Sequence, residues 1–170
     1  MLRGLFVTGT DTGVGKTIVA AALMHRYRLR SDGPVSDTCL TPLRYWKPVQ
    51  TGIEMDDDTR EAGRLGECAQ DELLASGIRL RHPVSPHLAA RRAGQAIDLD
   101  VVLDIVLAEP PARWIVEGAG GVLVPIDGAH TMAHLMVRLA LGVVVVARTT
   151  LGTINHTLLT IEALRARSLT

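Results

Sequence analysis

The sequence predicts an α/β protein of three layers, in which a mostly parallel sheet carries helices on both faces. Three observations lead to this fold class. Short apolar segments alternate along the chain with segments of helical periodicity. The run Val143–Val146 shows no polar alternation, which is typical of a parallel strand buried on both faces. The first apolar segment leads into a glycine-rich loop and then a helix, as phosphate-binding α/β folds do.

The first half of the chain alternates strands, helices and polar loops. A helix over about residues 15–30 is predicted by apolar residues at helical spacing, from Ile18 to Leu29. Proline and glycine indicate the loop over 31–42 and the turn over 82–86. The expected order along the chain is a strand over 4–8, the helix over 15–30, the loop over 31–42, a strand over 44–49, an acidic loop over 54–58, a helical stretch near 59–76 and the turn over 82–86.

The second half continues the alternation. Asp98 is a suitable N-cap for a helix that ends near Glu109. We then expect a strand over 114–117 that leads into four small residues, a helix over 131–141, a strand over 142–147 and a helix over 153–167. Another strand is due after that helix, so we expect residues 1–170 to form a single domain that lacks its C-terminal strands and helices.

Composition excludes several classes of protein. The chain has 170 residues, 47% of them hydrophobic, and a mean hydropathy of +0.22, which is unlike a disordered chain. Its formal net charge of +0 gives no reason to expect a nucleic-acid partner. No apolar run is long enough to span a bilayer, and Cys39 and Cys68 form no metal-binding or disulfide pattern. We therefore expect a cytoplasmic protein with no membrane partner.

The segment from Gly9 to Thr17 has the pattern of a phosphate-binding loop. Backbone N–H groups of Thr12, Gly13, Val14 and Gly15 would surround a nucleotide's phosphates, together with the N-terminus of the following helix. Lys16 would reach the terminal phosphates, and the Thr17 hydroxyl would bind Mg²⁺. The loop has five residues between Gly9 and Gly15, one more than the common pattern. The sequence thus predicts a P-loop NTPase fold that binds the phosphates of a nucleotide together with Mg²⁺.

Further polar residues follow other predicted strands. Lys47 lies near the end of the second strand, Glu117 ends the third, and Thr150 follows the valine-rich strand. Ligands of parallel sheets bind beyond the carboxyl ends of the strands. These side chains can therefore belong to one site with the phosphate-binding loop.

Five segments of the chain resemble dethiobiotin synthetase, the ATP-dependent ring-closing enzyme of biotin synthesis. They are the loop up to Thr17, Trp46–Gly52, Asp56–Thr59, Val116–Gly121 and Leu151–His156, and they occur in the family's order. The family shares the extra loop residue. The resemblance implies a homodimeric enzyme whose substrates are ATP, CO₂ and 7,8-diaminopelargonate, with Mg²⁺ as cofactor. It also implies that the chains of family members extend, through further strands and helices, beyond the position that corresponds to residue 170.

The resemblance also implies roles for individual residues. Lys16, Lys47 and Thr51 would act in catalysis, and Thr51 would contact a carbamate. Oxygen ligands for Mg²⁺ would come from Thr17, Asp58 and Glu117, and Glu117 would also contribute to the nucleotide site. The substrate would be held by Thr51, Gly120 and Gly121, and by Asn155 of the partner subunit.

Other interpretations stay open at this point. The acidic run over 56–58 can be a solvated loop, Glu117 can form a structural salt bridge, and Asn155 can cap the last helix. The glycines after Glu117 can form a simple tight turn. Two other functions compete with the ligase: a Par/Min-type nucleotide-switch ATPase, whose signature lysine is replaced here by Asp11, and an inactive nucleotide-binding fragment.

Overall fold

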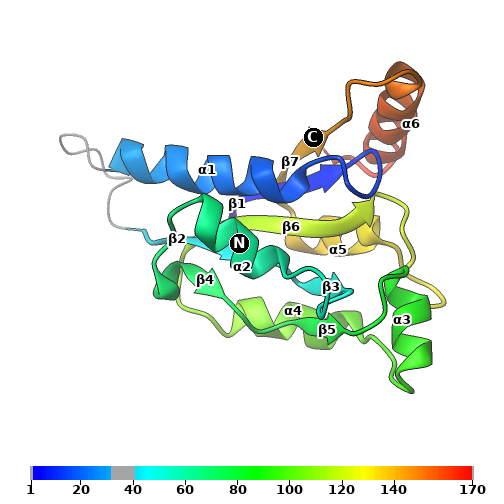
Figure 1. Ribbon diagram of the computed structural model, residues 1–170, viewed down its shortest axis with the longest axis horizontal. Coiled ribbons are helices and arrows are strands. Elements are labelled where there is room, and N and C mark those ends of the chain that lie inside the picture. The colour runs from blue at the N-terminus through cyan, green and yellow to red at the C-terminus, as the bar shows by residue number, and fades with distance from the viewer. Residues whose placement is uncertain (1, 32–40, 170) are drawn as a thin grey trace.

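A five-stranded parallel sheet forms the centre of the molecule (Figure 1). The computed structural model describes residues 2–31 and 41–169. The strand order is β4-β2-β6-β1-β7, and a separate two-stranded parallel sheet pairs β3 with β5. The strands are β1 (Arg3–Gly9), β2 (Leu43–Trp46), β3 (Val49–Thr51), β4 (Leu73–Leu74), β5 (Ile78–Leu80), β6 (Arg113–Gly121) and β7 (Gly142–Val146).

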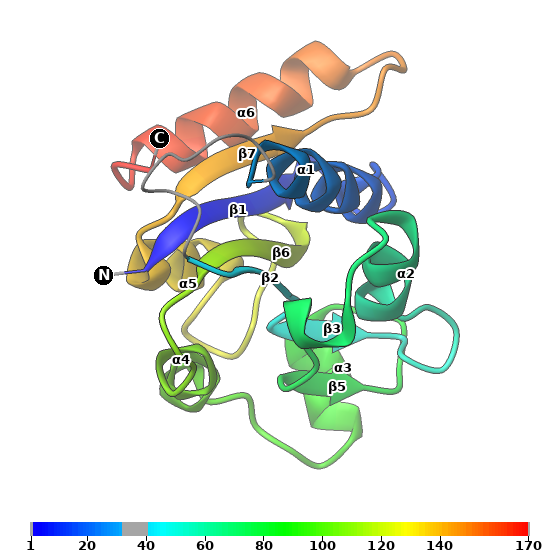
Figure 2. The same cartoon turned by 90° about the vertical axis from the view of Figure 1, so that its left-hand side faces the viewer.

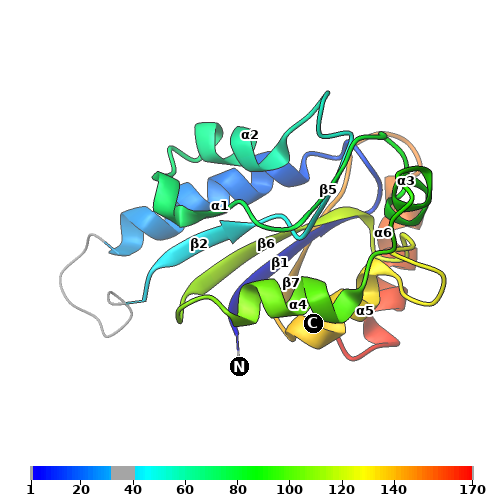
Figure 3. The same cartoon turned by 90° about the horizontal axis from the view of Figure 1, so that it is seen from below.

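Helices cover both faces of the sheet, so the molecule has three layers (Figure 3). The helices are α1 (Lys16–Ser31), α2 (Asp58–Leu65), α3 (Pro86–Arg92), α4 (Leu99–Leu107), α5 (Met132–Leu139) and α6 (Thr153–Arg165), with a 3₁₀ turn over Gln70–Glu72. In Figure 3, α1 and α2 lie on one side of the central strands, and α4 and α5 lie on the other. The predicted fold class is therefore confirmed.

Alternation along the strands divides the core into two apolar clusters. Phe6 packs into the cluster that includes α4 and α5, whereas its neighbour Val7 packs into the cluster that includes α1 and α2. Trp46 and Tyr45 divide between the two clusters in the same way. Successive side chains of a strand point to opposite faces, so each central strand fixes both helical layers. Helix α6 lies beside the edge strand β7 (Figure 2).

Two strands differ from the prediction in burial or length. The valine-rich strand β7 lies at the edge of the sheet and Val143–Val145 are only half-buried, so it is not buried on both faces. The strand expected over 114–117 extends to Gly121 in β6, so the glycines after Glu117 continue the strand.

Two further predicted elements are shorter than expected. The strand expected over 44–49 is interrupted, since β2 ends at Trp46 and β3 starts at Val49 in the second sheet. Pro48 lies between them, and proline has no N–H group to continue a strand ladder. The helix expected near 59–76 ends at Leu65, because Gly66 caps it and Glu67 follows with a left-handed φ of 52°.

Other predictions agree with the structure or fall outside it. Asp98 is the N-cap of α4, and its carboxylate accepts hydrogen bonds from the N–H groups of Asp100 and Val101. Most of the loop expected over 31–42, including Cys39, lies outside the described residues. Within the described ranges, no helix has both the length and the apolar character needed to cross a membrane.

Candidate functional site

The phosphate-binding loop connects β1 to α1 at the carboxyl edge of the sheet. Gly13 and Gly15 have φ angles of 69° and 97°, in the left-handed region that side chains disfavour. The Lys16 side chain, 7% exposed, folds back over the loop and donates a hydrogen bond from Nζ to the Asp11 carbonyl at 2.9 Å. The first turn of a helix leaves its N–H groups without intrahelical acceptors. The loop thus has the conformation that anion binding requires.

Four side chains meet beside this loop, and we call Thr17, Lys47, Asp58 and Glu117 the lysine–carboxylate cluster. Lys47 Nζ lies 2.6 Å from Asp58 Oδ2 and 2.9 Å from Glu117 Oε1. It also donates to the Gly118 carbonyl at 3.1 Å. The Thr17 hydroxyl lies 3.1 Å from Asp58 Oδ1 and 3.0 Å from Glu117 Oε1. Residues separated by up to 100 positions therefore share one set of polar contacts.

Strand register and helix capping place the members of this cluster. Strand β2 pairs with β6 so that Trp46 is opposite Val116. The residues that follow this pair, Lys47 and Glu117, therefore lie side by side. Asp57 is the N-cap of α2, and its side chain accepts a hydrogen bond from the Arg60 N–H. Asp58 is therefore the first residue of the helix and projects toward Lys47.

Burial and neighbouring charges shift the pKa values of the two lysines in opposite directions. Burial, and then the positive charge of Lys47, lower the pKa of Lys16 from its ordinary value. Burial alone would also lower the pKa of Lys47, but the negative charges of Glu117 and Asp58 outweigh it and raise that pKa. Lys47 therefore stays protonated between the carboxylates. Lys16 has the less compensated charge, which an anionic phosphate would complement.

The donor chemistry of the cluster fits Mg²⁺. Thr17, Asp58 and Glu117 present a hydroxyl and two carboxylates, which are the hard oxygen ligands that Mg²⁺ takes. A threonine hydroxyl has a single hydrogen and can donate it to only one carboxylate at a time. The convergence of both carboxylates on Thr17 thus brings three oxygen donors together. No group of three or more His, Cys, Asp or Glu in residues 2–31 and 41–169 has the arrangement of a metal site, so the hydroxyl would be an essential ligand.

Three buried or half-buried side chains support the cluster and were not predicted from the sequence. The Tyr45 hydroxyl donates to Glu117 Oε2 at 2.9 Å. Gln50 holds the loop before α2, since its amide group contacts the backbone of Thr51, Asp56 and Asp58. The third is Arg79, described below. Alternation could have indicated Tyr45, because a residue two positions before Lys47 in a strand shares its face.

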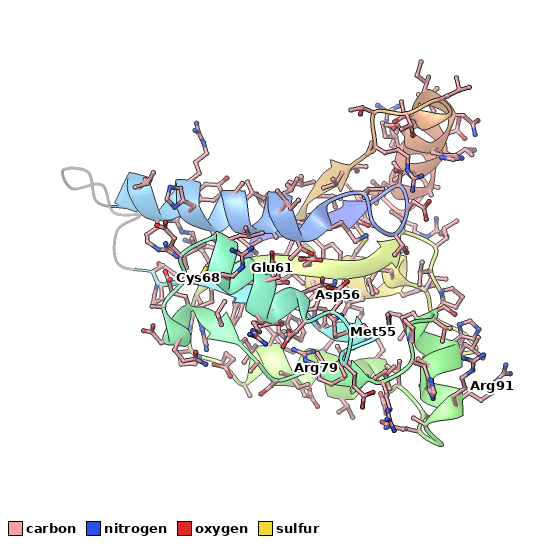
Figure 4. The ribbon with its side chains drawn as sticks, viewed as in Figure 1. Met55, Asp56, Glu61, Cys68, Arg79 and Arg91 are labelled. Atoms are coloured by element: carbon pink, nitrogen blue, oxygen red, sulfur yellow. The ribbon has the colours of Figure 1, made fainter. Side chains whose placement is uncertain are left out.

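Arg79 supports Lys47 from the two-stranded sheet. Its guanidinium donates to the carbonyl of Lys47 at 2.8 Å and to the carbonyl of Ala75 at 2.8 Å. Figure 4 shows Arg79 together with Asp56 and Met55, in the part of the molecule around β3 and the loop that precedes α2. Burial lowers the pKa of Arg79, against the opposing effect of Asp57. The sequence carries no distinctive signal for this residue.

The remaining predicted site residues lie at three places in the fold. Gly120 and Gly121 lie against the phosphate-binding loop, because a Cβ on Gly121 would be 3.3 Å from the Gly9 carbonyl oxygen and one on Gly120 would be 3.6 Å from Thr12 Oγ1. Thr51 is half-buried at the end of β3. Asn155 is exposed in the first turn of α6, and Gly152 is the N-cap of that helix, so Asn155 does not cap it.

The use of lysine in this chain is restricted to the site. Lys16 and Lys47 are the only two lysines in the sequence, whereas 16 arginines supply the other cationic side chains. Both lysines are buried, with exposed fractions of 7% and 3%. Every lysine ammonium of this protein therefore lies beside the phosphate-binding loop or in the lysine–carboxylate cluster.

Comparison with known proteins assigns the family. The family model described as "AAA domain" matches residues 3–170. The ATP-dependent dethiobiotin synthetase BioD of Rhodopseudomonas palustris (strain HaA2) is 46% identical over 169 residues, which is 99% of this chain and 71% of the relative. The protein of the same name from Paramagnetospirillum magneticum is 46% identical over 98% of this chain and 72% of the relative. This chain belongs to the dethiobiotin synthetase family.

Another dethiobiotin synthetase, from Sphingopyxis alaskensis, is 47% identical over 95% of this chain and 69% of the relative. The resemblance inferred from the five segments is thereby confirmed. Family membership also favours the ligase over the nucleotide-switch alternative.

Proposed function

We propose that this protein closes the ring of dethiobiotin from 7,8-diaminopelargonate and CO₂ at the expense of ATP. One observation carries the proposal: the carboxylates of Asp58 and Glu117 each contact both Lys47 and Thr17, directly beside a phosphate-binding loop. Transfer of a γ-phosphoryl group to a carbamate requires fixed positive charge at the phosphate and oxygen ligands for Mg²⁺. Membership of the dethiobiotin synthetase family supports the same activity.

The proposed reaction has three steps. One amine of the substrate adds to CO₂ and loses a proton, which gives a carbamate. A carbamate oxygen then attacks the γ-phosphorus of ATP, and ADP leaves. The second amine attacks the carbonyl carbon of the mixed anhydride, phosphate leaves, and the cyclic urea forms.

The residues would divide this work. The loop backbone from Thr12 to Gly15 would bind the phosphates, and Lys16 would neutralise charge on the transferred group. Lys47 would orient the carbamate toward the γ-phosphate of ATP, since its protonated ammonium is fixed by two carboxylates. Thr51 would donate a hydrogen bond to the carbamate. The raised pKa of Lys47 supports a role as a fixed charge rather than as a base.

Mg²⁺ would be held by Thr17, Asp58 and Glu117. When bound, it would reduce the negative charge of the ATP phosphates and orient them for in-line transfer. Glu117 would thereby also contribute to the nucleotide site. Glu117 also forms an ion pair with Lys47. A structural salt bridge and a Mg²⁺-ligand role are therefore compatible in the same carboxylate.

The decisive experiment measures ADP release with Mg²⁺, ATP and bicarbonate, in the presence and absence of 7,8-diaminopelargonate. Diamine-dependent release, with dethiobiotin identified by mass spectrometry, is the expected result. ADP release that DNA or lipid vesicles stimulate and the diamine does not would contradict the proposal and favour a nucleotide switch. A protein that binds ATP and releases no ADP would instead match the inactive-fragment alternative.

We also propose a homodimer in which Asn155 of one subunit contacts the substrate carboxylate held by Gly120 and Gly121 of the other. The exposed position of Asn155, away from the cap of its own helix, supports this arrangement. Mixing and re-associating Lys16→Ala with Asn155→Ala subunits tests it, because each mixed dimer would contain one intact site. Random association should restore about a quarter of the wild-type activity. Activity that stays at the level of the separate variants would contradict the shared site.

Two further expectations complete the proposal. Residues 1–170 would act as one nucleotide-binding domain and would unfold in a single cooperative transition. The use of ATP supports a cytoplasmic location. Calorimetric unfolding in two separated steps would contradict the single domain.

A further inference from the structure

We infer that Tyr45 is a positioning residue for Glu117, which it holds in the orientation that Mg²⁺ binding requires. The inference rests on the proposed function in one respect only, the assignment of Glu117 as a Mg²⁺ ligand. It adds a residue that lies outside the phosphate-binding loop and outside the lysine–carboxylate cluster.

The two oxygens of the Glu117 carboxylate have different partners. Oε1 lies 2.9 Å from Lys47 Nζ and 3.0 Å from the Thr17 hydroxyl, and so faces the proposed Mg²⁺ position. Oε2 points the other way and accepts the hydrogen bond of the Tyr45 hydroxyl at 2.9 Å. The last torsion of a glutamate side chain has a broad, roughly two-fold preference. Donors on both oxygens are therefore needed to fix the plane of this carboxylate.

Tyr45 can hold this orientation because its own position is rigid. Its side chain is fully buried, and its ring packs in the apolar cluster formed by β1, β6 and the helices α1 and α2. Strand β2 pairs Tyr45 with Ile115, two residues before Glu117 on the same face of β6. The hydroxyl is thus delivered to Glu117 by the sheet itself.

A structural role and a positioning role make different predictions. Outer-shell partners of metal ligands typically change metal affinity about 10- to 100-fold when they are removed. A tyrosine that served only the core would change the unfolding temperature and leave the metal dependence as it is. The Mg²⁺-dependent part of nucleotide binding therefore distinguishes the two roles without any turnover.

The experiment compares Tyr45→Phe with the wild type by calorimetric titration of ADP, with and without Mg²⁺. Tyr27→Phe is the matched control, because Tyr27 lies on α1 and packs against the same apolar cluster. In Tyr45→Phe, the affinity for ADP alone should stay within about twofold, and the gain in affinity on adding Mg²⁺ should fall about tenfold. The control should keep the full gain. An undiminished gain in Tyr45→Phe would overturn the inference.

A second comparison asks whether Tyr45 acts through Glu117. In a Glu117→Gln background, Tyr45→Phe should cause no further loss of the Mg²⁺ gain, since the group that Tyr45 orients is already altered. A further tenfold loss there would overturn the inference. Replacing Tyr45 with p-aminophenylalanine keeps a donor at the same ring position and should keep the gain. Loss of the gain in that folded variant would also count against the inference.

Failure of this inference can be distinguished from failure of the proposed ring-closing reaction. A wild-type protein whose ADP affinity does not respond to Mg²⁺ would overturn the role of Glu117 and this inference together. A protein that shows the Mg²⁺ response but no diamine-dependent ADP release would contradict the proposed reaction and leave the inference on Tyr45 supported.

Discussion

The ammonium of Lys47 lies 2.9 Å from Oε1 of Glu117, and the exposed fractions of the two side chains are 3% and 1%. Charges this deeply buried are costly unless they are paired. Each charge of this pair therefore offsets the energetic cost of burying the other. Both also lie where the proposed phosphoryl transfer would occur, so the same pair links stability to function.

Removal of Lys47 should affect both properties. Lys47→Met should lower the free energy of unfolding by about 3 kcal/mol, because it leaves a buried carboxylate without its partner. ADP release should be lost. In Lys47→Met/Glu117→Gln the loss of stability should be much smaller, since no unpaired charge remains, while activity stays absent. Urea unfolding of the three proteins checks this; an equal loss in both variants would show that packing, not charge, causes it.

Lys16→Ala should remove turnover and preserve the fold. Burial lowers the pKa of Lys16, so the folded state gains no stability from this charge. ADP release should fall at least about 100-fold, as for other groups that stabilise transition-state charge. Arg26→Ala, an exposed change on the same helix, serves as the control. Normal turnover of Lys16→Ala, measured alongside its circular dichroism, would rule out the role of the phosphate-binding loop.

Glu117→Gln should weaken ATP turnover and its Mg²⁺ dependence more than binding of the diamine. The amide keeps the size of the side chain but loses the negative charge that a Mg²⁺ ligand supplies. The Mg²⁺ concentration for half-maximal ADP release should rise about tenfold. If only the unfolding temperature changes, Glu117 serves the structure alone.

Gln50→Ala should loosen the loop that carries Thr51 and Asp58. The change leaves the Thr51 and Asp56 carbonyls and the Asp58 N–H without their side-chain partner. The free energy of unfolding should fall by about 2 kcal/mol. The KM for the diamine should rise. Gln95→Ala, at an exposed glutamine, should change neither quantity; equal effects of the two substitutions would contradict a role for the Gln50 contacts.

Asp127 should make stability depend on pH in the acid range. Partial burial opposes ionisation, but hydrogen bonds from the Ala129 N–H and from His130 lower the pKa of Asp127 below its ordinary value of 3.8. A lowered pKa in the folded state means that this stabilisation is present above pH 3.8 and is lost as the pH falls through the folded-state value.

Asp127→Ala should therefore cost about 1 kcal/mol at neutral pH and less as the pH falls below the ordinary value. Denaturant unfolding at several pH values checks this, with Asp100→Ala at an exposed surface pair as the control. A cost that stays constant over the whole range would exclude the ionised carboxylate as its cause.

Local patterns predicted the layers of the fold but not every boundary. The valine-rich strand and the N-cap at Asp98 depend on neighbouring residues, which the sequence displays directly. The break at Pro48 and the end of α2 at Leu65 depend on which sheet the following residues join. Which sheet a segment joins is decided by tertiary packing, and helical periodicity over 59–76 does not reveal it.

The site residues also differ in whether the sequence reveals them. Lys16, Lys47 and Glu117 could be singled out because each lies near or after the end of a predicted strand, and parallel strands bring their carboxyl ends together. Alternation places Tyr45 on the same face of its strand as Lys47, but the contact of its hydroxyl with Glu117 depends on the register of β2 with β6. Gln50 acts on the backbone up to eight residues away, which no spacing rule anticipates.

The restriction of lysine to positions 16 and 47 gives this protein two built-in reporters. Lysine labelled with ¹³C at Cε alone would produce just two labelled side-chain positions, one beside the phosphate-binding loop and one between Asp58 and Glu117. Nucleotide, metal and diamine could each be added while both signals are followed, with no other lysine in the spectrum. The chemistry of the site is thus open to observation in the unmodified chain.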